Sequence, residues 1–115
     1  MLLRMLKAKL HACRVTEANI NYLGSLTVSR EILEASGMRP YEEVLCANFE
    51  NGERFTTYII KTDRPGVIGL NGPAARMGKV GDRLIVMAFC LLTEDEANFH
   101  QPVVLLFDEH NRILQ

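Results

Sequence analysis

The chain contains no tryptophan, and aromatic residues make up only 7% of it. Cysteine is also scarce: Cys13, Cys46 and Cys90 are odd in number and widely spaced, which excludes a disulfide framework and a Cys-x-x-Cys metal site. We therefore interpret these three cysteines as buried, reduced thiols.

An excess of charge of either sign is absent as well. The 13 Lys and Arg residues nearly balance the 14 Asp and Glu residues, which gives a formal net charge of -1 and no basic block. This balance excludes the usual electrostatic signature of a nucleic-acid-binding protein. It favours a small, neutral partner over a polyanion.

Long hydrophobic runs are missing too. The longest one, residues 84–92, is too short to cross a bilayer as a helix. The apolar start of the chain is interrupted by Lys7 and Lys9 and lacks the cleavage site of a secretory signal. We therefore expect a cytoplasmic protein that has no membrane partner.

What the sequence does contain is enough apolar material for one core. The 115 residues are 48% hydrophobic, and we find no internal repeat, linker or low-complexity segment. A chain of this length and composition normally folds as one unit. We therefore expect a single domain over residues 1–115.

Alternating and β-branched segments predict several short strands. Between residues 7 and 12 polar and apolar residues alternate, so Lys9 and His11 should share one face of a half-buried strand. Asn51-Gly52 should form the turn of a hairpin, since Asn-Gly readily adopts the positive φ angles of tight turns. The strands of this hairpin and the further predicted strands are residues 44–49, 54–61, 67–70, 83–92 and 103–108, of which 83–92 should be buried on both faces.

Short helical segments are predicted between these strands. Ser29 is a favourable N-cap for a helix over residues 30–36, which Gly37 should end in a left-handed conformation. Pro73 can open a helical turn, and Thr93 to Glu96 match a capping box. Many short strands with small helices between them favour a closed β-barrel over a sandwich.

Several common catalytic patterns fit poorly. The glycines at 66, 69 and 72 lack the spacing of a phosphate-binding loop and are better read as turn residues. Ser25 lies outside any Gly-x-Ser-x-Gly elbow, so a hydrolase is a poor fit. His11, His100 and His110 lie on separate segments, and no metal site is predicted.

One collinear set of short motifs does point to a known chemistry. The set, in order, is Lys9-Leu10-His11, Tyr22-x-Gly24-Ser25, Asn51-Gly52-x-Arg54-x-x-Thr57-Tyr58, Asn71-Gly72-x-Ala74-Ala75-Arg76 and Val80-Gly81-Asp82. Over essentially its whole length the chain resembles the pyruvoyl-dependent aspartate 1-decarboxylases, which make β-alanine for pantothenate and hence coenzyme A.

The resemblance implies a self-processed lyase. The bond between Gly24 and Ser25 breaks by autocatalytic attack of the serine hydroxyl, which gives a β chain of residues 1–24 and an α chain of residues 25–115. Ser25 becomes a pyruvoyl group, which forms a Schiff base with L-aspartate and withdraws electrons as CO2 leaves. The implied fold is a mainly β, double-psi β-barrel with short helices between strands. It assembles as a homotetramer with active sites at the subunit interfaces, in some cases with a maturation factor.

The resemblance also implies a role for each motif residue. Thr57 polarises the scissile carbonyl, Tyr22 lies beside the processing site, and Tyr58 donates a proton to the substrate. Arg54 anchors a substrate carboxylate. The remaining positions line the substrate cleft, and they are Lys9, His11, Asn71, Gly72, Pro73, Ala74 and Ala75.

Each of these residues also has an ordinary structural explanation. Thr57 could be a plain strand residue, Arg54 a solvated hairpin residue, and Asn71 part of a turn. The whole chain could likewise be a non-catalytic double-psi barrel that binds a ligand and never cleaves at Gly24. Two points stay open: whether the pocket selects aspartate over glutamate, and how Ala47, where some relatives carry a bulky residue, affects its size.

Overall fold

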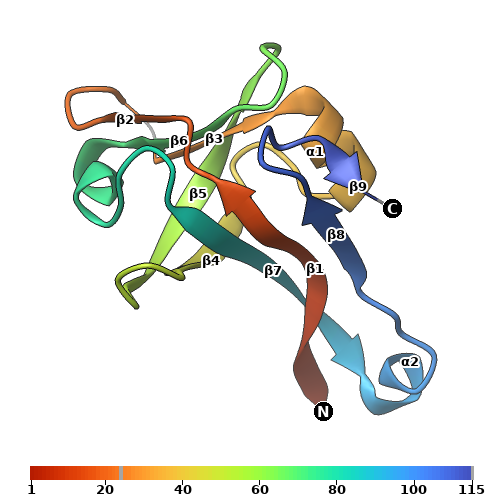
Figure 1. Ribbon diagram of the computed structural model, residues 1–115. Coiled ribbons are helices and arrows are strands. Elements are labelled where there is room, and N and C mark those ends of the chain that lie inside the picture. Colours follow the sequence, from red (N-terminus) through yellow and green to blue (C-terminus); the bar gives the residue numbers. More distant parts are fainter. Residues whose placement is uncertain (24, 115) are drawn as a thin grey trace.

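The computed structural model describes residues 1–23 and 25–114, and strands dominate it (Figure 1). Within this part of the chain the strands are β1 (Leu2–Arg14), β2 (Glu17–Asn19), β3 (Leu26–Ser29), β4 (Glu43–Asn48), β5 (Arg54–Thr62), β6 (Ile68–Asn71), β7 (Arg83–Thr93), β8 (Val103–Phe107) and β9 (Ile113–Leu114). The helices are α1 (Arg30–Ser36), the 3-10 helix η1 (Gly72–Arg76) and α2 (Glu94–Ala97). No helix among these residues is both long and apolar enough to cross a membrane.

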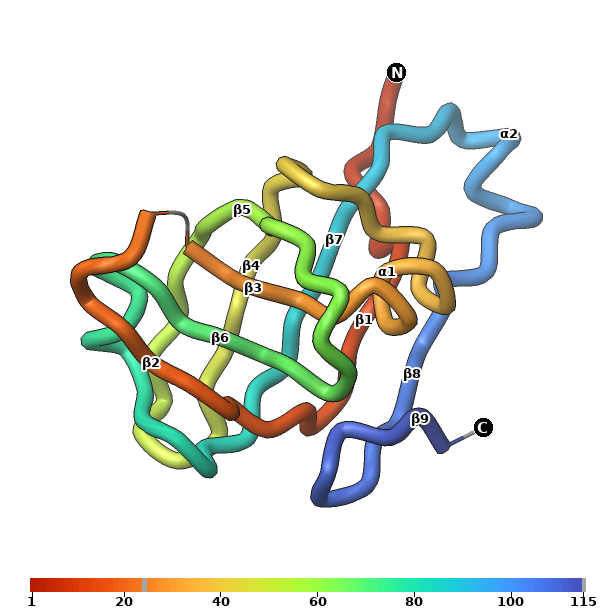
Figure 2. Tube along the Cα trace, turned by 90° about the horizontal axis from the view of Figure 1, so that it is seen from above, coloured from red at the N-terminus to blue at the C-terminus, as the bar shows by residue number. Residues whose placement is uncertain are grey.

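The N-terminal segment of the chain connects two distant parts of the sheet. Its strand order is β2-β6-β3-β5-β4-β7-β1-β8-β9, in which β1 and β2 stand far apart although only Val15 and Thr16 separate them along the chain. β1 pairs with β7 and β8, and β2 pairs in parallel with β6. Figure 2 shows this segment passing from one side of the sheet to the other. The arrangement confirms the predicted mainly β fold and agrees with a double-psi barrel.

The core follows from strand alternation. In β1, Ala8 and Leu10 are fully buried, whereas Lys9 and His11 lie on the opposite face and are half-buried, as predicted. β7 alternates in the same way instead of being buried on both faces, so that prediction was wrong. The reason is that only one face of β7 looks into the barrel; the other is the outer surface.

The predicted helix ends are largely confirmed. Gly37 ends α1 with a φ of +77°, and its N–H donates to the carbonyl of Leu33. Thr93 and Glu96 form both hydrogen bonds of the capping box at α2. Ser29 precedes α1 but makes no cap hydrogen bond, because its hydroxyl instead donates to the carbonyl of Arg64 at 2.7 Å and accepts from the N–H of Val67 at 2.6 Å.

The predicted hairpin is present as β4 and β5. These strands are antiparallel, with Ala47 opposite Arg54 and Glu43 opposite Tyr58. In the turn, Gly52 has a φ of +74°, so glycine is needed there. The hairpin carries three of the predicted site residues on β5. The register of its strands determines which residues of the neighbouring strands lie beside each of them.

Candidate active site

A cavity of about 280 Å³ lies where β3, β5 and η1 meet. It is lined by Ser25, Phe55, Thr56, Thr57, Pro73, Ala74 and Met77. The parallel pairing of β3 with β5 places Leu26 opposite Ile59 and so brings the start of β3 to the middle of β5. Four residues predicted from the sequence therefore share this cavity: Ser25, Thr57, Pro73 and Ala74. Gly24 lies outside the described residues.

The hydroxyl of Thr57 is buried in this cavity region without a hydrogen-bond partner among the described residues. An unsatisfied buried polar group costs about 1–3 kcal/mol of stability. Unpaired buried groups are uncommon and often have a functional reason. Thr57 lines the same cavity as Ser25.

Asn71 fixes the backbone next to Ser25. It is only 3% exposed, its N–H donates to the carbonyl of Ser25 at 2.9 Å, and its side-chain Nδ2 donates to Oγ1 of Thr27 at 2.7 Å. The following Gly72 adopts a φ of +59°, in the left-handed region that favours glycine. These contacts hold the beginning of η1 beside β3.

Two further predicted residues, Tyr22 and Asn71, line a neighbouring cavity of about 140 Å³ instead. Its lining is mostly polar and comprises Glu17, Asn19, Tyr22, Thr27, Ile60, Lys61, Thr62, Arg64 and Asn71. Ala75 belongs to η1 and is half-buried. The segment predicted to bind substrate thus lies between two adjacent cavities.

Lys9, His11 and Arg54 do not reach the Ser25 cavity. Register places Arg54 opposite Ala47, Ala47 opposite Ile85, and Ile85 opposite His11, so these four residues form a row on the outer face. Three strand spacings separate the ends of the row by about 14 Å. Lys9 lies beside this row, opposite Met87. One chain therefore divides the predicted site residues into two groups.

Tyr58 belongs to the outer face as well. It lies on the same side of β5 as Arg54, as the strand parity predicted, and is 41% exposed. Thr57, the intervening residue, points to the other side, toward the cavity. Tyr58 is therefore at the boundary between the two groups.

The ring of His11 makes an aromatic contact that no sequence motif predicted. The imidazole meets the ring of Phe49 edge to face, with centroids 5.7 Å apart, and its Nδ1 is buried without a partner among the described residues. The guanidinium of Arg83 lies 4.9 Å from the centroid of the same ring. Arg83 is itself bound to Glu50 at 2.9 Å, and these hydrogen bonds lower the pKa of Glu50.

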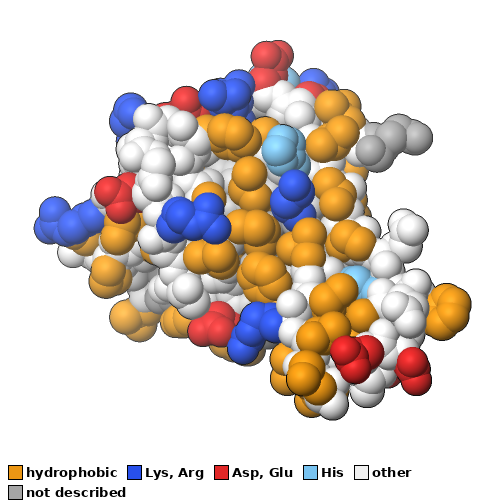
Figure 3. Space-filling view, turned by 90° about the horizontal axis from the view of Figure 1, so that it is seen from below, with side chains coloured by type: hydrophobic (Ala, Val, Ile, Leu, Met, Phe, Trp, Pro, Cys, Tyr) orange, Lys and Arg blue, Asp and Glu red, His pale blue; other side chains and the backbone are white. Residues whose placement is uncertain are grey.

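The outer face around β1 exposes several apolar side chains. Figure 3 shows hydrophobic side chains spread over one face of the molecule, interrupted by a few Lys, Arg and His side chains. On β8, Val104 lies opposite Lys9 and Leu106 opposite His11, and these two apolar residues are 43% and 44% exposed. Exposed apolar surface of this kind commonly marks a protein interface.

The three cysteines are free thiols that differ in burial. Cys13 and Cys46 are fully buried, as predicted, and burial raises the pKa of Cys13 to about 12 and raises that of Cys46 as well. Cys90 is only half-buried, so the prediction was wrong for this thiol. Within residues 1–23 and 25–114, no group of three or more His, Cys, Asp and Glu side chains is arranged to bind a metal ion.

Comparison with known proteins gives a consistent result. The family model described as aspartate decarboxylase matches residues 1–114. The chain is 49% identical to the aspartate 1-decarboxylase of Caldicellulosiruptor saccharolyticus, covering 100% of this chain and 91% of the relative. It is also 49% identical to that of Maricaulis maris, covering 99% and 95%, and 45% identical to that of Clostridium kluyveri, covering 100% and 91%. This chain belongs to the aspartate decarboxylase family.

Proposed function

We propose that this chain is an aspartate 1-decarboxylase that converts L-aspartate to β-alanine and CO2 for pantothenate synthesis, and that Ser25 is the precursor of its pyruvoyl cofactor. Full-length similarity to aspartate 1-decarboxylases supports the reaction. The observation that carries the role of Ser25 is the cavity that this serine shares with Thr57, whose buried hydroxyl has no hydrogen-bond partner in the described part of the chain.

In the proposed maturation, Ser25 Oγ attacks the carbonyl carbon of Gly24. The amide becomes an ester and the amine of Ser25 is freed. Elimination then breaks the bond between Cβ and the ester oxygen, which releases residues 1–24 with a free carboxylate, and hydrolysis at residue 25 releases ammonia and leaves residues 25–115. Thr57 is suited to stabilise the negative charge on the attacked carbonyl, because its hydroxyl is buried and has no competing partner within residues 1–23 and 25–114. Asn71 supports this geometry from the other side by donating to the carbonyl of Ser25.

The residues around Ser25 fit a pyruvoyl group. They offer a small cavity, a neutral donor in Thr57 and a short apolar wall formed by Pro73 and Ala74. When present, this group supplies an electron-withdrawing carbonyl for the electrons that remain when CO2 leaves. The protein then has to bind the substrate, orient its departing carboxylate and return one proton.

Substrate binding requires cations, since aspartate carries two carboxylates. None of the residues described as lining the Ser25 cavity is a lysine or an arginine. Lys9 and Arg54 lie instead on the outer face of the same chain, Arg54 at one end of the row that ends at His11 and Lys9 beside that row. A single copy therefore separates the cations from the reacting centre.

This separation supports a homotetramer whose sites form between copies. In this proposal the Ser25 cavity of one subunit faces Lys9, His11 and Arg54 of the next. Arg54 anchors a carboxylate through its planar guanidinium. The buried Nδ1 of His11, which has no partner among the residues that the structure describes, gains one at the interface. The apolar strip beside Lys9 and His11 supplies area for such a contact.

Tyr58 is the proposed proton donor. Its phenol is partly exposed on one chain and adjoins Thr57, so it lies near enough to the cavity to reach a substrate bound between copies. A neutral tyrosine hydroxyl can give a proton to the α-carbon once CO2 has left. Hydrolysis then releases β-alanine.

Intact-mass measurement during purification and warming tests the proposal. The wild-type chain should separate into fragments of residues 1–24 and 25–115, and β-alanine should form from aspartate. Ser25→Ala should fold, stay in one piece and be inactive, because the nucleophilic oxygen is lost with little change in volume. β-Alanine production by Ser25→Ala would contradict the role of Ser25. A wild-type chain that stays uncut and inactive would favour the non-catalytic binding barrel.

Two further properties, the need for a maturation factor and the selectivity for aspartate, can be measured on the same protein. Adding cell extract to uncut chain reveals whether a maturation factor accelerates processing, since the rate of fragment formation is then compared with and without extract. Glutamate offered in place of aspartate measures selectivity. Ala47, directly opposite Arg54, is the position at which a larger side chain would narrow the space beside the carboxylate anchor.

A further inference from the structure

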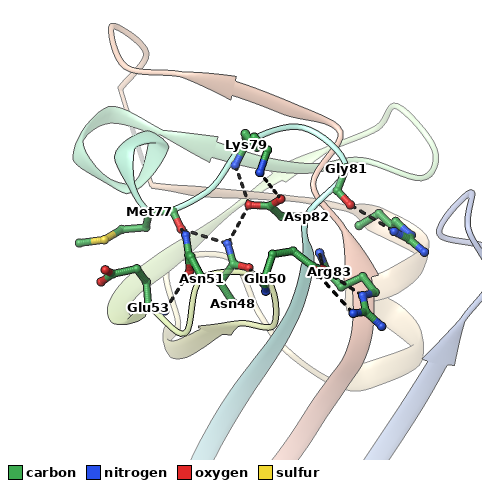
Figure 4. A network of polar contacts seen from close by, with 10 residues as sticks. Asn48, Glu50, Asn51, Glu53, Met77, Lys79, Gly81, Asp82 and Arg83 are labelled. Atoms are coloured by element: carbon green, nitrogen blue, oxygen red, sulfur yellow. Dashed lines mark hydrogen bonds and ion pairs between the residues drawn. The ribbon is translucent and has the colours of Figure 1, made fainter.

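One wall of the Ser25 cavity is the short segment of residues 72–77, which contributes Pro73, Ala74 and Met77. At its beginning, Asn71 attaches it to the backbone of Ser25. At its end, the carbonyl of Met77 accepts two side-chain hydrogen bonds, from Nδ2 of Asn48 at 3.0 Å and Nδ2 of Asn51 at 3.0 Å (Figure 4). Both donors belong to the β4–β5 hairpin.

Asn48 is the buried member of this pair. It is 3% exposed at the end of β4, and its Nδ2 also donates to Oδ2 of Asp82 at 3.0 Å. Its Oδ1 accepts from the N–H of Glu50 at 2.8 Å, so every polar atom of the amide is used. A Cβ on Gly78 would come within 2.8 Å of Asn48 Nδ2, which explains why only glycine fits beside this contact.

Asp82 fixes the direction of the Asn48 amide. The carboxylate is 4% exposed and also accepts from the N–H of Lys79 at 3.0 Å. Burial by itself raises the pKa of Asp82, but the hydrogen bonds from Asn48 and Lys79 outweigh it and lower the net pKa. An ionised carboxylate only accepts, so Asn48 must direct its NH2 group toward Asp82 and Met77.

We propose that Asn48 is a positioning residue for substrate binding, which sets the distance between the 72–77 wall and the β5 wall of the cavity through the carbonyl of Met77. The inference rests on the proposed function, because it takes the cavity at Ser25 as the place where aspartate binds. Asn48 touches none of the reacting groups. It acts by linking the end of the wall to the hairpin that carries Thr57 and Arg54.

Loss of this link should affect binding more than chemistry. Thr57 is placed by β5, and Ser25 is placed by β3 and Asn71, so both stay in position when the far end of the wall moves. Pro73 and Ala74 move with Met77, because the N–H of Met77 donates to the carbonyl of Ala74 at 2.9 Å. The substrate pocket therefore widens while the processing centre stays intact.

The test compares two variants at the Met77 anchor. Asn48→Ala should still process at Ser25 but show a KM for aspartate raised about tenfold, with kcat changed less than twofold. Asn51→Ala removes the exposed donor to the same carbonyl and should raise KM about threefold. Since Asn51 lies on an exposed turn, this second variant keeps the fold even where Asn48→Ala does not.

Asn111→Ala is the matched control. Asn111 is likewise buried, at 2% exposure, and makes three hydrogen bonds, but these connect the β8–β9 turn to Arg14 and Gly66. Its loss should lower the melting temperature to a similar extent and leave KM unchanged.

Unchanged KM in Asn51→Ala and in folded Asn48→Ala would overturn the inference. An equal rise of KM in Asn111→Ala would overturn it too, because the effect would then follow stability alone. Failure of the proposed function looks different, since the wild-type chain itself would form no fragments and no β-alanine.

Discussion

Removing the hydroxyl of Thr57 should make the protein more stable and at the same time stop its maturation. Thr57→Val keeps the shape of the side chain and removes an oxygen that is buried without a partner among the described residues. Such an atom costs about 1–3 kcal/mol. We therefore expect the free energy of unfolding to rise by about 1 kcal/mol, which corresponds to a melting temperature higher by about 4 °C for a chain of this length.

Thr27→Val is the matched control. Thr27 is also buried on a barrel strand, but its Oγ1 accepts a hydrogen bond of 2.7 Å from Nδ2 of Asn71. Valine at this position leaves the amide of Asn71 without that partner. The same chemical change should therefore lower the free energy of unfolding by about 1–3 kcal/mol.

Urea unfolding measures both variants, and all chains should carry Ser25→Ala so that each stays uncut and the same covalent species is compared. A second set that keeps Ser25 is followed by intact mass, where Thr57→Val should form fragments far more slowly than wild type. Destabilisation by Thr57→Val as large as that by Thr27→Val would refute the reasoning on the unpaired hydroxyl. Cleavage of Thr57→Val at the wild-type rate would remove Thr57 from maturation.

Two other outcomes can be checked separately. Tyr58→Phe should still form both fragments but produce β-alanine slowly, since it lacks the proposed proton donor; unchanged turnover in a coupled β-alanine assay would exclude that role. In the native protein, a thiol reagent should modify Cys90 quickly and spare the buried Cys13 and Cys46, and all three should react in urea. Rapid labelling of Cys13 in the native state would contradict its burial.

The parts of the fold that the sequence predicts well are those determined by neighbouring residues. The left-handed Gly37, the capping box at Thr93 and the turn at Gly52 each depend on a few adjacent positions, and all three are confirmed. Alternation in β1 likewise assigned Lys9 to the correct face. Each of these features is determined by a few neighbouring residues, so the local sequence is enough to predict it.

The parts that escaped prediction depend on distant partners. β2 and β3 are short, and each forms a parallel pair with a strand more than thirty residues away, β2 with β6 and β3 with β5. Ser29 was predicted to cap a helix because serine is common at that position. Its actual hydrogen-bond partners, Arg64 and Val67, lie on a distant segment that the local sequence does not reveal. For the same reason the sequence offered candidate site residues but did not predict that some line the cavity and others lie on the outer row.

The proposed cut after residue 24 would separate the segment that contains β1 and β2 covalently from the rest of the barrel. In the mature form that we propose, residues 2–14 and 17–19 belong to one separate peptide of residues 1–24. The first range pairs with both β7 and β8, and the second pairs with β6 on the other side of the barrel. A subunit processed in this way would be a complex of two polypeptides, and its refolding after denaturation would be a bimolecular reaction that slows on dilution. The uncut precursor folds in a unimolecular reaction, whose rate does not depend on concentration. At low protein concentration the proposed cut would therefore make refolding of the barrel slower than its first folding.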